Sequence, residues 1–181
     1  MNRACVITLC LASVASSSAQ PVNQKPTKFD LSKLGMVIDG EQECNDTGNR
    51  LQDFPSPVMD QIIAAGPNAM QILIGLIADR RMAKTKEPLI CYWPGMAVGD
   101  IAFVLLIDLC TDTGRRTTVP GADWTDLLGP GNDAAAWEQL HGFIKRRGSR
   151  ALQDRWRVVW NKYRRQVSWD SKERCFKLKA N

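Results

Sequence analysis

Residues 98–111 have the sequence VGDIAFVLLIDLCT, and this stretch decides the fold. Nearly every position from Ile101 to Leu109 is apolar, so the pattern predicts a helix that is apolar around most of its circumference. Such a helix must be surrounded by other elements, and we expect it at the centre of the protein. Asp100 stands at the start of the run and is interpreted as a helix cap.

Two shorter helices are predicted before this stretch. Ser56-Pro57 provides a capping residue followed by proline in the first turn, and the apolar residues of 58–63 recur at helical spacing. Gly66-Pro67 ends that helix and starts another, predicted over 68–81, which is apolar on nearly all sides. Arg80-Arg81 is expected at its C-terminal end, where the helix dipole favours positive charge.

Residues 56–112 thus combine two short helices, joined by a Gly-Pro turn, with a very apolar third helix entered through the sequence VGDIA. This pattern resembles the helical pairs of HEAT-like repeat proteins. The resemblance covers less than a third of the chain, and it implies an α-helical layer that could present a binding surface. It implies no chemistry.

Three more helices are predicted beyond residue 112. A short one is expected at 124–128. A longer one, marked by the apolar residues of 134–144, is capped by Asp133 and closed by Gly148. The last, over 149–165, has its apolar residues in a single stripe at the helical period.

A C-terminal β-hairpin is predicted because polar and apolar residues alternate in 167–170 and again in 175–178. Isolated hairpins are marginally stable, so this one must dock on the helices or be held by Cys175. The predicted class is mainly α, with five to six helices in a HEAT-like or irregular orthogonal bundle. The core should centre on 70–77 and 101–109, closed on the other side by three tryptophans: Trp137, Trp156 and Trp160.

The first 19 residues have the pattern of a secretory signal peptide. One arginine precedes a mostly apolar run at 4–15, and small residues follow up to Ala19, after which we place the cleavage. The alternatives fit less well, because a membrane anchor needs about 20 apolar residues and a lipidated Cys10 needs a small residue before it. We expect a secreted or periplasmic protein with a flexible leader at 20–35 and a single helical domain at 36–181.

Four cysteines remain after the predicted cleavage: Cys44, Cys91, Cys110 and Cys175. An even number in an oxidising compartment favours at least one disulfide, and the sequence leaves all three pairings open. The alternative is that some are small buried residues with free thiols. The cysteine spacing matches no metal motif, so neither a metal nor another cofactor is expected.

Positive charge is concentrated in the C-terminal part of the chain. The whole chain has 24 basic and 19 acidic residues, whereas residues 112–181 hold 15 basic and 8 acidic ones. The candidate binding face for an anionic partner consists of five arginines of the last two helices: Arg146, Arg147, Arg150, Arg157 and Arg164. The alternative is an ordinary solvated helix face, because the neighbouring aromatic residues follow the apolar stripe. Export argues against nucleic acid as the partner.

No catalytic residue is predicted. His141 is the only histidine and the chain has no Gly-x-Ser-x-Gly elbow, so the sequence does not support a Ser-His-Asp or Cys-His hydrolase. A glycosidase needs only two carboxylates, for which Glu138, Asp100 and Asp123 are candidates. The alternatives are a helix cap for Asp100 and a helix-surface charge for Glu138. The sequence therefore favours a secreted, non-catalytic binding protein of the cell envelope or extracellular space, with a protein or an anionic envelope component as partner. The alternative is a cell-envelope polysaccharide hydrolase with paired carboxylates.

Overall fold

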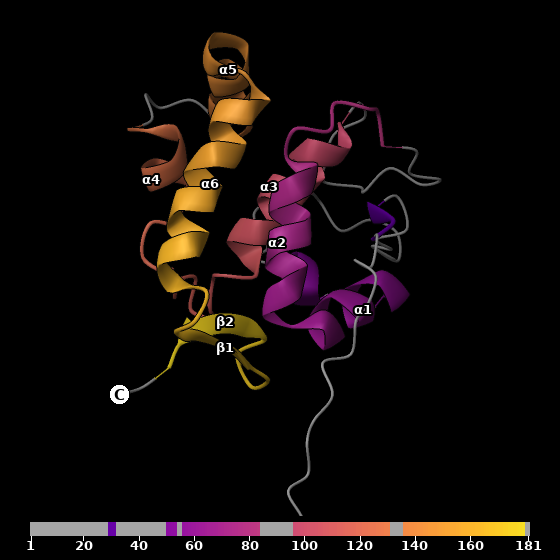
Figure 1. Cartoon of the computed structure of the whole chain (residues 1–181), viewed down its shortest axis with the longest axis vertical. Coiled ribbons are helices and arrows are strands. Elements are labelled where there is room, and N and C mark those ends of the chain that lie inside the picture. The colour runs from indigo at the N-terminus through magenta and orange to yellow at the C-terminus, as the bar shows by residue number, and fades with distance from the viewer. Residues whose placement is uncertain (1–28, 32–49, 54–55, 84–95, 131–135, 180–181) are drawn as a thin grey trace, which may run out of the picture.

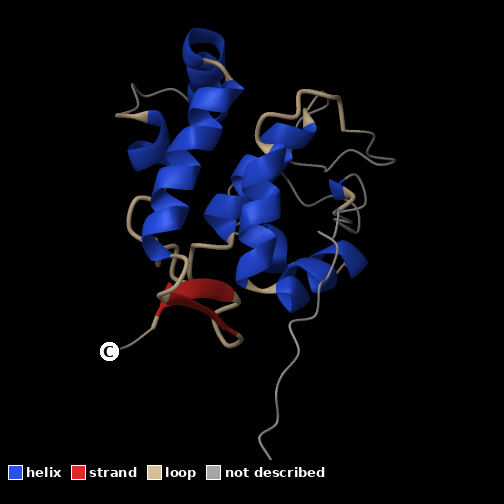
Figure 2. Cartoon of the chain, in the orientation of Figure 1, coloured by secondary structure: helices blue, strands red, loops and turns tan. Residues whose placement is uncertain are grey.

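The computed structural model describes residues 29–31, 50–53, 56–83, 96–130 and 136–179 (Figure 1). These ranges contain six α-helices, a short 3-10 helix and a two-stranded antiparallel sheet, as Figure 2 shows. In chain order the elements are η2 (Leu51–Asp53), α1 (Pro57–Ala65), α2 (Pro67–Leu76), α3 (Val98–Asp108), α4 (Trp124–Leu128), α5 (Ala136–Arg147), α6 (Ser149–Tyr163), β1 (Val167–Asp170) and β2 (Cys175–Leu178). The predicted mainly α class with a C-terminal hairpin is confirmed. No helix in the described ranges has the length and apolar character needed to cross a bilayer.

Helix α3 lies at the centre, as its apolar sequence predicts. All its residues from Gly99 to Ile107 are buried, and it packs against α2 and η2 (Figure 1). The Asp100 carboxylate accepts a hydrogen bond of 3.0 Å from the Ala97 backbone N–H, which stabilises the first turn. Gly99 permits a close approach to the segment after α2, because a Cβ at this position would lie 2.1 Å from the carbonyl oxygen of Ile77.

Helices α1 and α2 begin and meet where the sequence predicts. Ser56 caps α1, since its Oγ accepts a hydrogen bond of 3.1 Å from the Met59 backbone N–H. Gly66, with φ of +56°, separates the two helices in a conformation that favours glycine. The predicted Gly-Pro junction is therefore confirmed.

Helix α2 ends at Leu76, so the prediction of a helix over 68–81 is wrong in its C-terminal part. The chain turns there, and residues 81–83 pair with residues 96–98 through two backbone hydrogen bonds of 2.9 Å. Local periodicity could not predict this ending, because the competing partner is supplied by a segment more than ten residues further along the chain.

The two arginines expected at the end of α2 have other roles. Arg80 forms an ion pair with the buried carboxylate of Asp100, and Arg81 pairs with Asp79. Neither side chain stabilises the α2 terminus as predicted, because the helix stops before reaching them. Arg80 instead compensates a charge at the start of α3.

Helix α6 packs its predicted apolar stripe inward. Leu152, Trp156 and Trp160 are buried, whereas Trp137 of α5 is only half-buried. Gln153 is buried beside this stripe and donates hydrogen bonds of 2.8 and 2.9 Å to two carbonyls near the end of α2. Helix α6 thereby connects α5 to the α2–α3 core.

The C-terminal hairpin forms over the predicted residues and docks on the helices (Figure 2). Phe176 of β2 is fully buried, with its ring centroid 6.4 Å from that of Trp160. Its backbone N–H donates a hydrogen bond of 2.7 Å to the carbonyl of Leu109, just after α3. The hairpin is thus part of the core, and this packing provides the stability that an isolated hairpin would lack.

Two short N-terminal segments also contribute to the core. Phe29 and Leu31 fall within the predicted leader, yet they are buried with exposed fractions of 3% and 2%. Arg50 is buried as well, and its Nη1 donates hydrogen bonds of 2.7 Å to the carbonyls of Thr111 and Glu173. Arg50 thereby joins the chain before α1 to the end of α3 and to the hairpin.

Several predictions concern residues outside the described ranges. They are the signal peptide at 1–19, most of the leader, Cys44, Cys91 and the Asp133 cap.

Candidate functional site

The five arginines predicted to bind an anionic partner are all exposed, and they are here termed the basic face: Arg146, Arg147, Arg150, Arg157 and Arg164. Arg150 and Arg157 lie on α6, and Arg164 is the C-cap residue that directly follows it; the three recur every seven residues, so they form one stripe along this helix and its C-terminal end. The buried side of the same helix carries Trp156 and Trp160. Local helix geometry alone therefore separates the charged stripe from the aromatic one.

Acidic residues offset little of the charge on this face. Residues 136–165 contain nine basic and two acidic residues. Within the described part of the chain, the one ion pair of the basic face joins Arg157 to Asp154 at 2.7 Å, and both side chains are exposed. Helix α2, which packs beside α6, has the uncharged sequence PNAMQILIGL. Helix α6 thus packs against a helix without carboxylates.

Arg155 differs from the arginines of the basic face. Its Nη1 donates a hydrogen bond of 2.6 Å to the carbonyl of Leu127 in α4, and its guanidinium lies 4.8 Å from the ring centroid of Phe143 in α5. These contacts join three helices, so Arg155 has a structural role.

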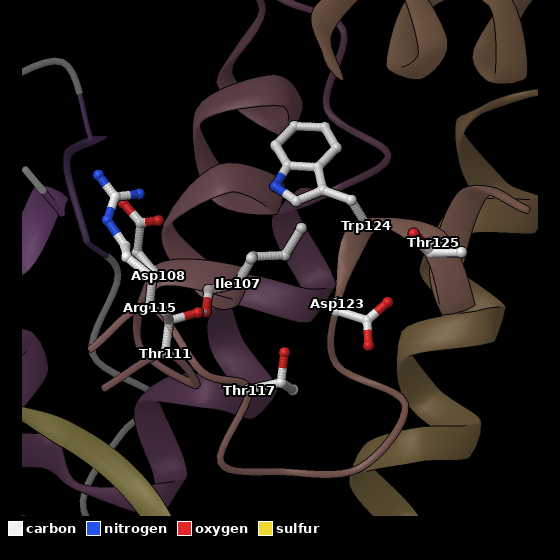
Figure 3. Close-up of a pocket in the computed structure, with 8 residues that line it drawn as sticks. All are labelled: Ile107, Asp108, Thr111, Arg115, Thr117, Asp123, Trp124 and Thr125. Carbon is white, nitrogen blue, oxygen red and sulfur yellow. Dashed lines mark hydrogen bonds between the residues drawn. The ribbon is translucent and has the colours of Figure 1, made fainter. Parts of the chain in front are cut away.

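An open pocket of about 570 Å³ lies between the end of α3, the loop at 111–117 and the start of α4. Figure 3 shows Asp108 and Arg115 on one side of it, Asp123 on the other, and the Trp124 indole above Ile107. Three threonines complete the lining: Thr111, Thr117 and Thr125. Carboxylates, hydroxyls, a guanidinium and an indole together suit a polar ligand with many hydrogen-bonding groups.

Asp108 is the most perturbed carboxyl of the pocket. Burial raises its pKa to about 6, and the hydrogen bond of 2.8 Å that its Oδ2 accepts from the Leu51 backbone N–H only partly opposes this. The nearby guanidinium of Arg115 also lowers the pKa. With a pKa of about 6, Asp108 can donate or accept a proton near neutral pH more readily than an ordinary aspartate can.

The opposite wall of the pocket is held by local structure. Asp123 caps α4, since its Oδ1 accepts a hydrogen bond of 2.7 Å from the Asp126 backbone N–H. The Trp124 ring packs edge-on against buried Phe103 of α3, with 5.1 Å between the ring centroids. Asp123, a candidate from the sequence, therefore has both a structural role and a place in the pocket.

Asp100 and His141 lie together at the other end of α3. The Nε2 of His141 is 3.8 Å from Oδ2 of Asp100, and the His141 ring packs on Trp137 with centroids 4.4 Å apart. Asp100 is already engaged by Arg80 and by the Ala97 N–H. The cluster joins α5 to the start of α3, and it supports a structural role for Asp100.

Of the three carboxylates selected from the sequence, Glu138, Asp100 and Asp123, only Asp123 lines the pocket. Asp100 and Asp108 are eight residues apart on α3, or about 12 Å along the helix axis. Carboxylates that flank one glycosidic bond are separated by at most about 9.5 Å. Glu138 is exposed on α5. The pocket instead combines Asp123 with Asp108, a residue that the sequence analysis did not select.

The apolar sequence around Asp108 contains a signal that could have identified it. It is the one charged residue between Ile101 and Leu109, and an isolated charge on a buried helix often has a specific role. Arg115 gives no such signal, because its position depends on the loop, where it adopts a φ of +64°.

The two cysteines in the described ranges, Cys110 and Cys175, are buried free thiols. In the same ranges, no cluster of three or more His, Cys, Asp or Glu side chains is placed to bind a metal ion. Comparisons with protein families, curated proteins and solved structures found no match to this chain.

Proposed function

We propose that the mature chain is an exported, non-catalytic binding protein of the cell envelope or extracellular space, and that its basic face binds a polyanionic partner. The observation that carries this proposal is the exposed stripe of Arg150, Arg157 and Arg164 along α6, a helix that packs against the uncharged helix α2. Guanidinium groups held at regular spacing on a rigid helix can contact successive sulfate, phosphate or carboxylate groups of a polymer.

The HEAT-like pattern of residues 56–112 belongs to the same proposal, because stacked helices commonly present binding surfaces. So does the export signal. If residues 1–19 direct export, the secreted protein should begin at Gln20, which N-terminal sequencing of the secreted product would test. A product that retains residues 1–19, or that stays in the cytoplasm, would contradict export.

Heparin serves as a probe for polyanion binding. We expect the wild-type protein to be retained and to elute with salt, and the variant Arg150→Ala/Arg157→Ala/Arg164→Ala to elute much earlier. In titrations, losing three ionic contacts should reduce the slope of log affinity against log salt by about 2–3.

The matched control is Arg81→Ala/Lys172→Ala/Lys179→Ala, which removes the same charge from exposed positions elsewhere. If both variants lose the same retention, net charge rather than the basic face explains the binding. If the Arg150→Ala/Arg157→Ala/Arg164→Ala variant elutes with the wild-type protein, the basic face is only a solvated surface.

The second candidate function is hydrolysis of a cell-envelope polysaccharide. It is supported by the pocket, where Asp108 and Asp123 lie on opposite sides and Trp124 offers an aromatic surface to a sugar ring (Figure 3). The raised pKa of Asp108 suits a general acid, while Asp123 would be the second carboxylate.

Release of reducing ends from peptidoglycan and chitin-like polymers tests this alternative. Asp108→Asn and Asp123→Asn should each abolish turnover, whereas Asp126→Asn, on the exposed side of α4, should keep it. Absence of turnover by the wild-type protein on these polymers would leave the binding function alone.

A further inference from the structure

Cys110 and Cys175 meet where the chain leaving α3 crosses the C-terminal hairpin. Both residues are fully buried, and both are free thiols in the structure. Their chain neighbours are bonded to each other, because the backbone N–H of Phe176 donates a hydrogen bond of 2.7 Å to the carbonyl of Leu109. The two cysteines therefore belong to adjacent backbone segments.

The two segments run antiparallel. The Nη1 of Arg50 bridges the carbonyls of Thr111 and Glu173, with 2.7 Å to each. Contacts thus pass from Leu109 with Phe176 to Thr111 with Glu173, and Cys110 and Cys175 both lie between these two contacts. A disulfide requires two cysteines on neighbouring backbone segments, with Cα atoms about 4.4–6.8 Å apart.

The side chain of Thr118 closes the space around the two thiols. Its hydroxyl donates hydrogen bonds of 2.7 Å to the carbonyl of Cys110 and 2.5 Å to that of Phe176, and it also lies beside the Cys175 thiol. Burial raises the pKa of both thiols, and the proximity of Cys175 raises the pKa of Cys110 further. The two sulfur atoms thus share one buried site.

We propose that Cys110 and Cys175 form a disulfide when the chain folds in an oxidising compartment, and that this bond fastens the hairpin to the end of α3. The inference rests on the proposed export, because cytosolic thiols are kept reduced. It selects one of the three pairings that the sequence leaves open.

The oxidant is an external disulfide, such as oxidised glutathione or a thiol oxidoreductase. One cysteine thiolate attacks it, forming a mixed disulfide and releasing one reduced thiol. The second cysteine thiolate then attacks the protein sulfur of the mixed disulfide and releases the other thiol. Two protons and two electrons leave the protein, and the oxidant gains them. Because both thiols are buried in the folded state, this exchange takes place before the hairpin finishes docking.

Mass spectrometry of non-reduced tryptic digests tests the pairing. Trypsin releases Cys175 in the tripeptide CFK and Cys110 in the peptide of residues 87–115. Cys91 is in that same peptide, so the experiment uses the full chain carrying Cys91→Ala, where a link to CFK reports Cys110 alone. We expect this linked pair in protein purified from a bacterial periplasm, and also in protein made reduced and refolded with oxidised glutathione.

The two preparations separate this inference from the proposed export. If the chain's own leader fails to direct export but the glutathione-refolded protein contains the Cys110–Cys175 link, export is wrong and the pairing stands. If the exported protein contains Cys44 linked to either cysteine, or if both thiols remain open to alkylation after denaturation, the pairing is overturned.

Thermal unfolding provides a second readout. The bond closes a loop of more than 60 residues, so the melting temperature of the wild-type protein should fall by about 10 °C on reduction. Cys110→Ala/Cys175→Ala should melt at the same temperature with or without reductant, and the control Cys44→Ala/Cys91→Ala should keep the full difference. A control variant that loses the difference would assign the stabilising disulfide to another pair.

Discussion

Gln153 of α6 donates a hydrogen bond of 2.8 Å from Nε2 to the carbonyl oxygen of Ile74 in α2, and a second of 2.9 Å to the carbonyl of Gly75. The side chain is buried, so it satisfies two carbonyls at the open end of α2 away from water. A single polar side chain therefore joins the helix of the basic face to the core.

Gln153→Leu should destabilise the fold by about 1–3 kcal/mol, because two buried carbonyls lose their donor while the volume of the side chain is nearly kept. Chemical denaturation measures this change. Gln71→Leu, at an exposed position of α2, is the control and should change stability by less than about 0.5 kcal/mol. Equal effects from the two variants would mean that the Gln153 hydrogen bonds contribute little.

Two glycines on neighbouring helices should respond to alanine in opposite directions. At Gly99 a Cβ would lie 2.1 Å from the Ile77 carbonyl oxygen, so Gly99→Ala must push α3 away from the end of α2 and cost more than about 3 kcal/mol. At Gly75 a Cβ would have no neighbour within 4 Å, so Gly75→Ala should stabilise α2 by about 0.5–1 kcal/mol. Melting curves of both variants check the pair, and a harmless Gly99→Ala would show that the two segments are further apart.

Arg155 and Arg157 are two residues apart on α6, and their substitutions should affect different properties: stability for Arg155 and binding for Arg157. Arg155→Ala removes the contacts with Leu127 and Phe143 and should destabilise by about 1–3 kcal/mol. Arg157→Ala removes an exposed ion pair, so it should cost at most about 1 kcal/mol but weaken retention on heparin. Unfolding and heparin elution of the same two proteins give both readouts. If Arg155→Ala were the variant that lost heparin retention while remaining folded, the basic face would be misplaced.

Asp108 should make stability fall as pH rises from about 4 to about 6. Burial raises its pKa in the folded state to about 6, above the ordinary value of 3.8, so the folded protein binds the proton more tightly than the unfolded chain. The stabilisation is complete below pH 4 and is lost as pH approaches and passes 6. Asp108→Asn cannot ionise and can still accept the Leu51 hydrogen bond. Its stability relative to the wild-type protein should therefore increase by up to about 2 kcal/mol between pH 4 and pH 7.

Unfolding measured across that pH range in both proteins isolates Asp108, because both proteins contain all the other carboxyls. Both proteins also become less stable in acid, because the folded state lowers the pKa of four other carboxyls: Asp53, Asp112, Asp170 and Glu173. A difference between the proteins that does not change with pH would show that Asp108 ionises as an exposed aspartate does.

Signals carried by a few adjacent residues were sufficient for much of the fold. The Ser56 cap, the Gly66 junction and the alternating pattern of 167–170 and 175–178 each act within a single turn or hairpin, and the structure confirms all of them. The uniformly apolar 101–109 segment likewise had to be central, because no other location removes every side of such a helix from water.

The errors and omissions all involve partners distant in sequence. Helix α2 stops at Leu76 because the segment after it pairs with residues 96–98. Phe29 and Leu31 join the core from a stretch whose composition is that of a linker. Helical periodicity depends only on residues close in sequence. It therefore predicts a longer α2 and gives no signal for isolated apolar residues such as Phe29 and Leu31.

The sequence by itself determined that this is a mainly helical chain with an apolar centre, a C-terminal hairpin and a group of arginines off the apolar stripe of its last two long helices. Helical and strand periodicity place side chains on faces without reference to the rest of the molecule. Tertiary structure alone decided which groups meet across the chain. It gave the α3–α4 pocket both Asp108 and Asp123, separated Asp100 from Asp108 along α3, and brought together the backbone segments that contain Cys110 and Cys175. These pairings depend on how the helices pack, and no local pattern contains that information.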